Sequence, residues 1–414
     1  MNKNIFQPAE ILLPKDADME KWAVIACDQF TSDQAYWDRV REKAGDAPST
    51  IHLILPEAEL GSEGEAAHIA QINRTMQDYM EQGVFAAYPE SYVYVERTLE
   101  NGTIRKGLIG KLDLDAYDYR PGSTSPIRAT EKTVTERIPP RQRVRRNAPI
   151  ELPHILMLCD DHEKKLIEPV AAKKDSMQKL YDFDLMEDGG HIRGWLVADE
   201  DARAFDAALA EYCEHVDEKY VGLPGVPMVF AVGDGNHSLA TAKSCYEELK
   251  AAHPGEDLSN HPARWALVEL ENIHDEAQVF EPIHRVIVNT EPEKLLAALQ
   301  EYCAPEGYEV KWYSGETCGT VTLDPARSEL AVGVLQGFLD KYLKENPGEI
   351  DYIHDDDALI SLARQDKAIG FLLPAMEKSQ LFRGVIRDGA LPRKTFSMGH
   401  SREKRYYLEG RKIR

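Results

Sequence analysis

Apolar residues along the chain follow two patterns, short continuous runs and recurrences every three or four positions. The runs predict buried strands, and the recurrences predict helices with one buried face. Strands are expected at 22–26, 51–55, 92–97, 104–112, 155–158, 192–197, 227–232 and 264–270. Helices are expected at 64–82, at 164–181 and from Asp199 onward, where acidic residues favour the first turn. The alternation of the two kinds of element indicates a mixed α/β (α+β) protein.

The order of these elements also suggests how the chain is organised. The strands at 92–97 and 104–112 are close enough to pair in antiparallel fashion, so a purely parallel sheet is not expected. Prolines between 121 and 149 bracket an arginine-rich stretch, which is expected to be an extended surface loop. We expect an N-terminal α/β region at 1–120, a region with the basic loop and a glycine-containing turn at 121–290, and a C-terminal α/β region at 291–414.

Composition narrows the class of protein. With 414 residues the chain can bury the cores of two or three compact units. It has no run of about 18 apolar residues, so no membrane partner is expected. Its six cysteines form no C-x-x-C pair, which favours reduced thiols over zinc ribbons or disulfides. The first residues lack the layout of a signal peptide, so a cytoplasmic location is expected.

Charge argues against nucleic acid as a partner and singles out one basic segment. The net charge of −22 would repel a phosphate backbone over a broad face. Residues 128–146 nevertheless carry seven lysines and arginines against two glutamates. The later arginines of this segment suit a solvated loop that pairs with acidic neighbours. Arg128 and Arg137, close to Glu131 and Glu136, are better candidates for binding a substrate anion.

The richest chemistry lies in the turn Gly233-Asp-Gly-Asn-His-Ser238, between an expected strand and an expected helix. Within five residues the turn gathers a carboxylate, an amide, an imidazole and a hydroxyl. Backbone N–H groups at a helix N-terminus attract anions, and the two glycines let a phosphate approach closely. The alternative is a structural turn in which Asp234 or Asn236 only caps the helix. His237 favours a functional site, because such a turn does not need an imidazole.

The same turn resembles the (A/G)-D-G-H-H-R signature of the domain-of-unknown-function family 1015, whose turn is in turn similar to that of the ParB/sulfiredoxin-like superfamily. Further segments that resemble the family occur in the right order at 23–28, 128–132, 181–183, 351–355, 369–374 and 391–396. The resemblance covers nearly the whole chain and implies a ParB/sulfiredoxin-like core of sheet and helices with additional α/β elements. One departure matters: Ser238 stands where the family commonly has arginine, a bidentate phosphate ligand.

Superfamily relatives include nucleotide-dependent kinases that act on free serine. The resemblance therefore implies a cytosolic protein that binds a phosphate-bearing small molecule, with phosphoryl transfer from ATP, ADP or another nucleotide, with Mg²⁺, to a small hydroxy amino acid. In that hypothesis the ligand-binding residues are Gly233, Gly235, Asn236, Ser238, Arg128, Arg137, Lys394 and Thr395. Asp234 would orient His237 or hold Mg²⁺, His237 would stabilise the phosphate or relay a proton, and Glu131 would be the general base. The protein is expected to assemble, if at all, as a homodimer.

Two other functions compete with this hypothesis. A nucleotide-binding regulator would use the same turn without catalysis, and Ser238 in place of arginine favours it. A metallophosphoesterase is suggested by Gly235-Asn-His237 but rejected, because the chain lacks the G-D-x-x-D motif of those enzymes and Gly399-His-Ser-Arg402 lacks the second histidine of their G-H-x-H motif. The acidic runs at 354–357 and 159–162 could attract a cation. For 354–357 the start of a helix is favoured instead.

Overall fold

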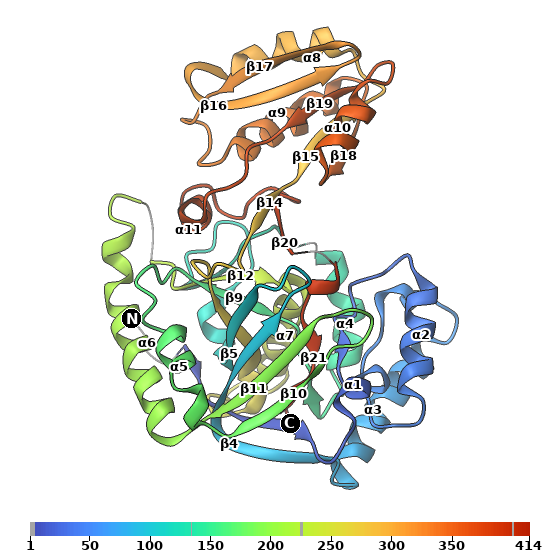
Figure 1. The fold of residues 1–414 in the computed structure, drawn as a ribbon, viewed down its shortest axis with the longest axis vertical. Helices are drawn as coiled ribbons and strands as arrows, with labels where there is room; N and C mark the ends of the chain where they lie inside the picture. Colours follow the sequence, from blue (N-terminus) through green and yellow to red (C-terminus); the bar gives the residue numbers. More distant parts are fainter. Residues whose placement is uncertain (1–4, 134, 224–226, 400) are drawn as a thin grey trace.

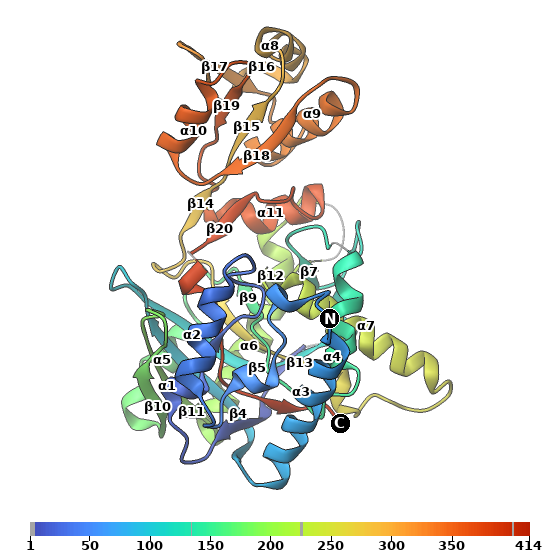
Figure 2. The same cartoon turned by 90° about the vertical axis from the view of Figure 1, so that its right-hand side faces the viewer.

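The computed structural model describes residues 5–133, 135–223, 227–399 and 401–414, with only the backbone of Arg137. Two bodies of mixed α/β structure lie one above the other (Figures 1 and 2). The larger body contains most of the chain, including both of its ends, and the smaller one is formed by residues 284–372. The segments between them, including a helix and a short strand pair, connect the two. The mixed α/β class predicted from the sequence is confirmed.

A single mixed sheet forms the centre of the larger body. Its order is β10 (Lys179–Asp184), β11 (His191–Val197), β4 (Phe85–Thr98), β5 (Ile104–Asp113), β13 (Trp265–Asn272), β9 (Leu156–Cys159), β12 (Phe230–Asp234), β7 (Ile127–Ala129) and β6 (Tyr117–Asp118). Two more strands join it, with β1 (Phe6–Gln7) on β5 and β2 (Ala9–Pro14) on β4. The pair β4–β5 is antiparallel as expected, whereas β12–β7 and β13–β9 are parallel.

Both faces of this sheet are buried. Along β4, Tyr92 and Tyr94 face one core, whereas Val93 and Val95 face another. Strands with two covered faces lose the alternation of polar and apolar residues, which is why they appear in the sequence as continuous apolar runs. The helices that cover the sheet are α1 (Met19–Trp22), α2 (Gln34–Ala44), α3 (Glu65–Glu81), α4 (Ile138–Arg145), α5 (Ile167–Ala171), α6 (Asp199–Lys219) and α7 (Asn236–Ala252).

The smaller body contains a second sheet. Its order is β17 (Thr317–Leu323), β16 (Cys303–Ser314), β19 (Ile369–Leu372), β15 (His284–Val288) and β18 (Glu349–Ile353), with helices α8 (Pro292–Leu299), α9 (Ala331–Glu345) and α10 (Asp356–Ala363). Helix α11 (Lys378–Asp388) follows and lies between the two bodies (Figure 2). One apolar core joins this body to Leu158 and Ala231 of the main sheet. The expected division at 120 and 290 stays a prediction.

The last part of the chain returns to the larger body in three short strands. These are β20 (Phe396–Met398) on β14 (Phe280–Pro282), β21 (Tyr406–Tyr407) on β3 (Val24–Ile25), and β22 (Arg411–Lys412) on β8 (Ile150–Glu151). The buried Arg97 fixes this segment, because its guanidinium donates hydrogen bonds to the carbonyl oxygens of Arg402 and Glu403 at 2.6 and 3.1 Å. Residues 402–407 are thereby held beside the sheet.

Three expectations about individual elements were wrong. Residues 51–55 are not a strand, because Ser49 caps a 3-10 helix, η1 (Thr50–Leu53). The helix expected at 164–181 is only the five-residue α5, after which buried Tyr181 and Phe183 alternate with exposed neighbours in β10. The stretch at 121–149 is not extended throughout, since it contains α4. The prolines at its second and third positions need no N–H partner there, so they suit a helix start.

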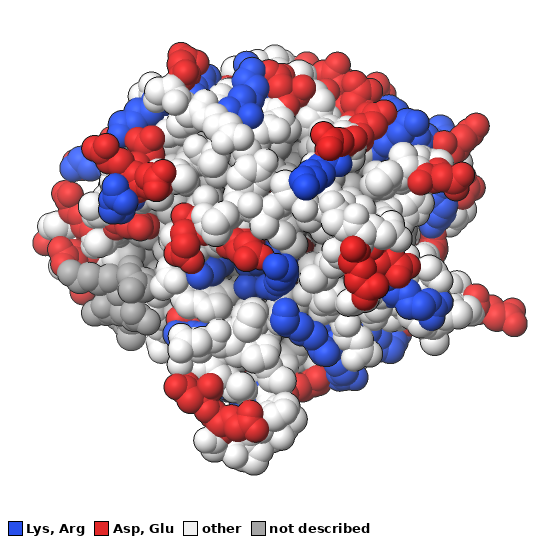
Figure 3. Space-filling view, turned by 90° about the horizontal axis from the view of Figure 1, so that it is seen from below, with Lys and Arg blue, Asp and Glu red and all other residues white. Residues whose placement is uncertain are grey.

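Short 3-10 segments complete the secondary structure, at η2 (Glu57–Glu59), η3 (Leu114–Ala116), η4 (Thr135–Arg137), η5 (Lys174–Ser176), η6 (Pro262–Arg264), η7 (Gln300–Tyr302) and η8 (Ser401–Glu403). Within the described ranges, none of the helices combines the length and apolar character needed to cross a membrane. On the face seen from below in Figure 3, acidic side chains lie among lysines and arginines.

Candidate functional site at the start of helix α7

The glycine-containing turn joins β12 directly to α7, as the sequence predicts. Gly235 is the residue before the helix and has φ of 77°, a left-handed conformation that favours glycine. A Cβ atom there would also lie 3.0 Å from the Cα of Ile155. Because Gly235 has no side chain, no N-cap side chain accepts a hydrogen bond from the first N–H groups of α7. The helix therefore begins with polar N–H groups whose positive end faces the turn.

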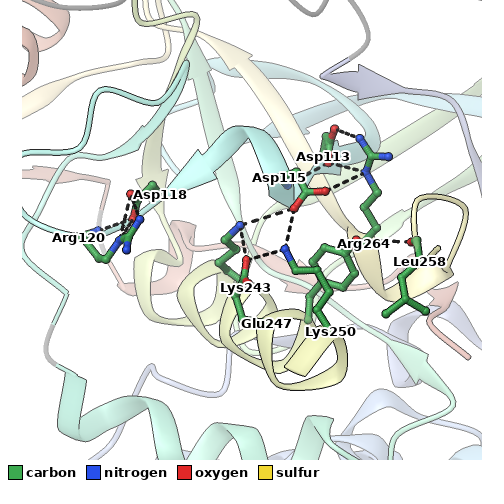
Figure 4. Close-up of polar contacts among 10 residues, drawn as sticks. Asp113, Asp115, Asp118, Arg120, Lys243, Glu247, Lys250, Leu258 and Arg264 are labelled. Atoms are coloured by element: carbon green, nitrogen blue, oxygen red, sulfur yellow. Dashed lines mark hydrogen bonds and ion pairs between the residues drawn. The ribbon is translucent and has the colours of Figure 1, made fainter. Parts of the chain in front are cut away.

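Ion pairs fix helix α7 against the sheet. Lys243 and Lys250 approach the Asp115 carboxylate of η3 at 3.8 and 3.1 Å, and Glu247 bridges the two lysines (Figure 4). Beyond them, Arg264 pairs with Asp113 at 2.6 Å (Figure 4). These contacts lie along the helix and not at its N-terminus, so they hold α7 in place without covering the turn.

On one side of the turn lies a group of charged side chains. The Lys404 ammonium is 3.2 Å from the Asp234 carboxylate. Strand β7 runs beside β12, and the Thr130 hydroxyl donates to the Val232 carbonyl at 2.6 Å. This pairing places Glu131, the next residue, beside Asp234. Burial and the negative charge of Asp234 raise the pKa of Glu131, while Lys394 and Lys404 oppose that rise. A carboxylate with a raised pKa is better suited to accept a proton.

The segment around Lys394 lies against Glu131. Leu391 donates its N–H to the Thr130 carbonyl at 2.7 Å, and the Lys394 N–H donates to the Glu131 carboxylate. Lys394 has φ of 58°, an unusual backbone conformation for a lysine. The buried Thr395 hydroxyl donates to the Pro392 carbonyl at 2.6 Å. The loop thus holds the Lys394 ammonium group near the Glu131 carboxylate.

The smaller body contributes further positive charge. Arg285 of β15 is fully buried and donates hydrogen bonds to Gln336 and to the Arg393 carbonyl at 2.8 and 3.1 Å. Burial lowers the pKa of Arg285 to about 10, although Tyr352 and the charge of Glu131 act in the opposite direction. The Arg393 guanidinium in turn donates to the Tyr352 hydroxyl at 2.6 Å. The charged side of the turn therefore draws on both bodies of the protein.

On the other side of the turn, the Ser238 hydroxyl lies 3.3 Å from the His154 Nε2 atom. The Nδ1 atom of the same ring is 2.7 Å from the Tyr407 hydroxyl, and Nε2 is 3.6 Å from the Asp28 carboxylate. Burial would raise the pKa of Asp28, but the charge and hydrogen bond of His154 lower it below its ordinary value. Burial and the Asp28 charge raise the pKa of the Cys27 thiol to about 11.

The remaining residues of the turn are half-buried. The His237 carbonyl accepts a hydrogen bond from the Thr241 hydroxyl at 2.7 Å. Among the described residues, none forms a hydrogen bond with the buried Asn236 Oδ1 atom, a costly situation that a ligand N–H or O–H group would relieve. Gly233 lies against Leu158 and Met398, where a Cβ would come within 3.0 Å of their side chains. The turn is therefore tightly packed at its glycines, and its polar groups are those of Asn236, His237 and Ser238.

The basic segment is divided in the structure. Arg128 lies beside Ala231, three residues before Asp234, and its guanidinium donates to the Ser125 carbonyl at 2.8 Å. It lines a small hollow with Asp118, Tyr119 and Ala390, and none of the turn residues lines this hollow. The side chain of Arg137 lies outside the described residues. The later arginines form the pairs Arg141–Glu57, Arg143–Glu65, Arg145–Glu151 and Arg146–Glu248, which confirms the paired interpretation.

Neither acidic run is assembled as a metal centre. Among the described residues there is no group of three or more histidine, cysteine or acidic side chains that could hold a metal ion. Asp355 caps α10 by accepting the N–H of Ala358 at 2.7 Å, so this run starts a helix as expected. In the other acidic run, at 159–162, the Asp160 carboxylate accepts hydrogen bonds from His274 and Tyr220.

Sequence reasoning missed Lys404, His154 and Tyr407 as members of this site. Lys404 and Tyr407 reach the turn only because the C-terminal segment pairs with β3, and no local motif marks them. His154 precedes β9, the neighbour of β12 in the sheet. The sequence could have indicated His154 only through its position just before the buried strand β9.

These features define a mixed α/β protein with a polar strand–turn–helix site. The chain matches the family described as "Protein of unknown function (DUF1015)" over residues 7–409, and it belongs to that family. Among solved structures it is similar to a mutant of a free serine kinase in complex with AMP, with 11% identity, a TM-score of 0.38, and coverage of 73% of this chain and 91% of the kinase.

Two further structures show a similar degree of likeness. A conserved hypothetical protein from Pyrococcus furiosus has 10% identity and a TM-score of 0.35, with 72% of this chain and 92% of that chain covered. C-terminally truncated SbnI from Staphylococcus aureus has 12% identity and a TM-score of 0.34, with coverage of 70% and 83%. No curated protein matches the chain.

Proposed function

We propose that the Gly233–Ser238 turn binds the phosphate groups of a nucleotide, and that the protein transfers a phosphoryl group to a small hydroxy compound such as serine. In this proposal the strand, turn and helix correspond to a ParB/sulfiredoxin-like core. The protein acts in the cytoplasm, and a homodimer is the proposed assembly. Ligand and acceptor are both small molecules.

The observation that carries the proposal is the start of α7. A helix of 17 residues begins at a glycine that supplies no capping side chain, so the positive end of the helix is not neutralised by its own N-cap and suits an anion. Lys404 and the Lys394 loop bring positive charge to the same place. Phosphoryl transfer needs such donors around the phosphate oxygens, since most of its catalysis is positioning and charge stabilisation.

Glu131 supplies the base that the reaction requires. The acceptor hydroxyl gives its proton to the Glu131 carboxylate, and its oxygen forms a bond to the terminal phosphorus. The bond between that phosphorus and the bridging oxygen breaks, and the shortened nucleotide leaves with the electron pair. Asp234 would hold Mg²⁺ or orient His237, and Mg²⁺ would neutralise charge on the phosphates. His237 stabilises the transferred group or relays a proton.

A non-catalytic nucleotide-binding regulator is the second candidate. The observation in its favour is Ser238, because a serine cannot grip phosphate with the two-pronged geometry of arginine. In that case the turn would hold the nucleotide, and the charged residues beside it would only tune affinity.

One experiment separates the two candidates. Isothermal titration with ATP, ADP and CTP, each with Mg²⁺, measures affinity, and product analysis with serine and other hydroxy compounds measures turnover. We expect His237→Ala to abolish turnover while leaving most of the nucleotide affinity, which the backbone supplies. His253→Ala, at the far end of the same helix, is the matched control.

The other outcomes assign the turn differently. Loss of affinity by about 1–3 kcal/mol in His237→Ala, with no turnover in either protein, identifies a regulator. A lower melting temperature with no nucleotide binding in the unmodified protein identifies a structural turn and overturns the proposal.

A further inference from the structure

A cavity of about 140 Å³ lies beside the turn, with Ser238 and Thr241 of α7 in its wall. It lies between the N-terminal segment, α3, α4 and the first turns of α7. Most of its wall is apolar, with contributions from Leu53, Leu55, Met76, Val144, Ile150 and Leu152. A cavity of about 150 Å³ in a protein core is large enough to hold a benzene ring. The space therefore suits one ring or a branched chain of similar size.

One end of the cavity is polar. His154, Ser238, Tyr407 and Cys27 line it there. Tyr407 contacts Nδ1 of the His154 ring, and Nε2 faces Ser238 at 3.3 Å and the Asp28 carboxylate at 3.6 Å. Both distances are long for hydrogen bonds, so a ligand hydroxyl that contacts His154 and Ser238 would replace a weak interaction between them with two stronger ones. Thr241 does not compete, because its hydroxyl donates to the His237 carbonyl.

Each charged residue in these parts of the wall already has a partner of opposite charge. Arg141 forms an ion pair with Glu57, and Glu151 pairs with Arg145 at 2.6 Å and with Arg411 at 2.7 Å. Arg141, Glu57, Arg145 and Glu151 line the cavity. A charged ligand would have to lose its hydration without gaining an unpaired counter-ion, which is unfavourable in a small apolar space. The lining thus favours a neutral molecule.

We propose that this cavity is a binding site for a compact neutral molecule, a single ring or branched hydrocarbon that carries one hydroxyl group. Its apolar part fills the space beside Met76, and its hydroxyl hydrogen-bonds to His154 and Ser238. The site differs from the proposed phosphate site in that it does not require Glu131, Asp234 or Lys404, although Ser238 belongs to both.

Benzyl alcohol serves as the probe, with benzene, benzoate and benzylammonium for comparison. Full-length protein labelled with ¹³C at the methionine methyl groups reports where the probe binds, because a bound aromatic ring shifts the Met76 methyl resonance. Met76→Leu assigns that resonance. We expect saturable shifts of the Met76 signal with benzyl alcohol, weaker binding of benzene, and no shift with either charged probe.

Variants test the two halves of the site. Ser238→Ala should weaken benzyl alcohol at least threefold and leave benzene unchanged, whereas Ser244→Ala, on the same helix but outside the cavity wall, should change neither. Ala148→Leu should fill part of the space and abolish binding of both. If this variant does not fold, Val144→Phe makes the same test. A Met76 signal that no probe moves overturns the proposal. Equal binding of benzoate, or equal effects of the two serine variants, also overturns it. None of these outcomes depends on nucleotide binding.

Discussion

The two sides of the Gly233–Ser238 turn differ sharply although one short peptide forms both. On one side Glu131, Asp234 and Lys404 surround the start of α7 with charge. On the other, His154 and Ser238 close a largely apolar cavity. The turn itself supplies backbone N–H groups and a hydroxyl. Segments that are distant in the sequence supply the rest, so they decide what each side can bind.

The comparison is clearest for two carboxylates, one on each side. Burial and the neighbouring Asp234 raise the pKa of Glu131, so its charged form is disfavoured. Asp28 is held in its charged form, because His154 lowers its pKa against the effect of burial. Groups whose pKa values are pushed apart in this way commonly mark different roles. Here Glu131 suits proton transfer, and Asp28 suits a fixed partner for His154.

The largest effect is expected from Glu131→Gln. If Glu131 is the base, turnover should fall by about 10²–10⁴-fold while nucleotide affinity stays nearly unchanged. Product formation and titration calorimetry measure the two quantities. Glu136→Gln, an exposed glutamate five residues later, serves as the control. Equal turnover in the Glu131 variant and the parent protein would show that Glu131 is not the catalytic base.

A smaller effect is expected from Lys404→Ala. The change removes a positive charge and leaves Asp234 without its partner 3.2 Å away, so nucleotide binding should weaken by about 1.5–3 kcal/mol. Binding of benzyl alcohol on the other side should not change. Lys412→Ala removes a half-exposed lysine that pairs with Glu10 and should alter neither affinity. The comparison between the two sides fails if Lys404→Ala weakens both ligands alike.

The two carboxylates should give stability opposite dependences on pH. Glu131, with its raised pKa, destabilises the fold increasingly as pH rises above 4.5, the ordinary value, so Glu131→Gln should be the more stable protein at neutral pH. Asp28, with its lowered pKa, contributes stability that is lost as pH falls below 3.8, so Asp28→Asn should lose less stability in acid. Urea unfolding at several pH values measures both, and the same sign for both would contradict the assignment.

The smallest effect concerns thiol reactivity. Because the pKa of Cys27 is raised to about 11, little thiolate is present near pH 7, and iodoacetamide should modify it slowly. The exposed Cys318 should react faster. Mass spectrometry of digested protein gives both rates, with Cys27→Ser as the reference. Alkylation of Cys27 as fast as Cys318 would show that its side of the turn is more open and more polar than described.

Local sequence patterns predicted the elements that rest on local physics. The helices at 65–81 and from Asp199, the antiparallel pair β4–β5, and the strand–turn–helix at Gly235 all follow from periodicity and from glycine's conformational freedom. The pattern failed at α4, where prolines start a helix, and at 164–181, where the α-helix covers only α5 and the last residues belong to β10.

For the candidate site, the sequence by itself determined the turn and its polar residues, and the family resemblance added Glu131, Lys394 and Thr395. Tertiary structure decided which of these meet. Parallel pairing of β7 with β12 brought Glu131 beside Asp234, whereas the Arg128 side chain lines a hollow without the turn residues. The return of the C-terminal segment to β3 brought Lys404 and Tyr407 to opposite sides of the turn. Sheet pairing between segments over a hundred residues apart depends on the burial of whole sheet faces. The sequence of one strand therefore does not indicate which distant strand pairs with it.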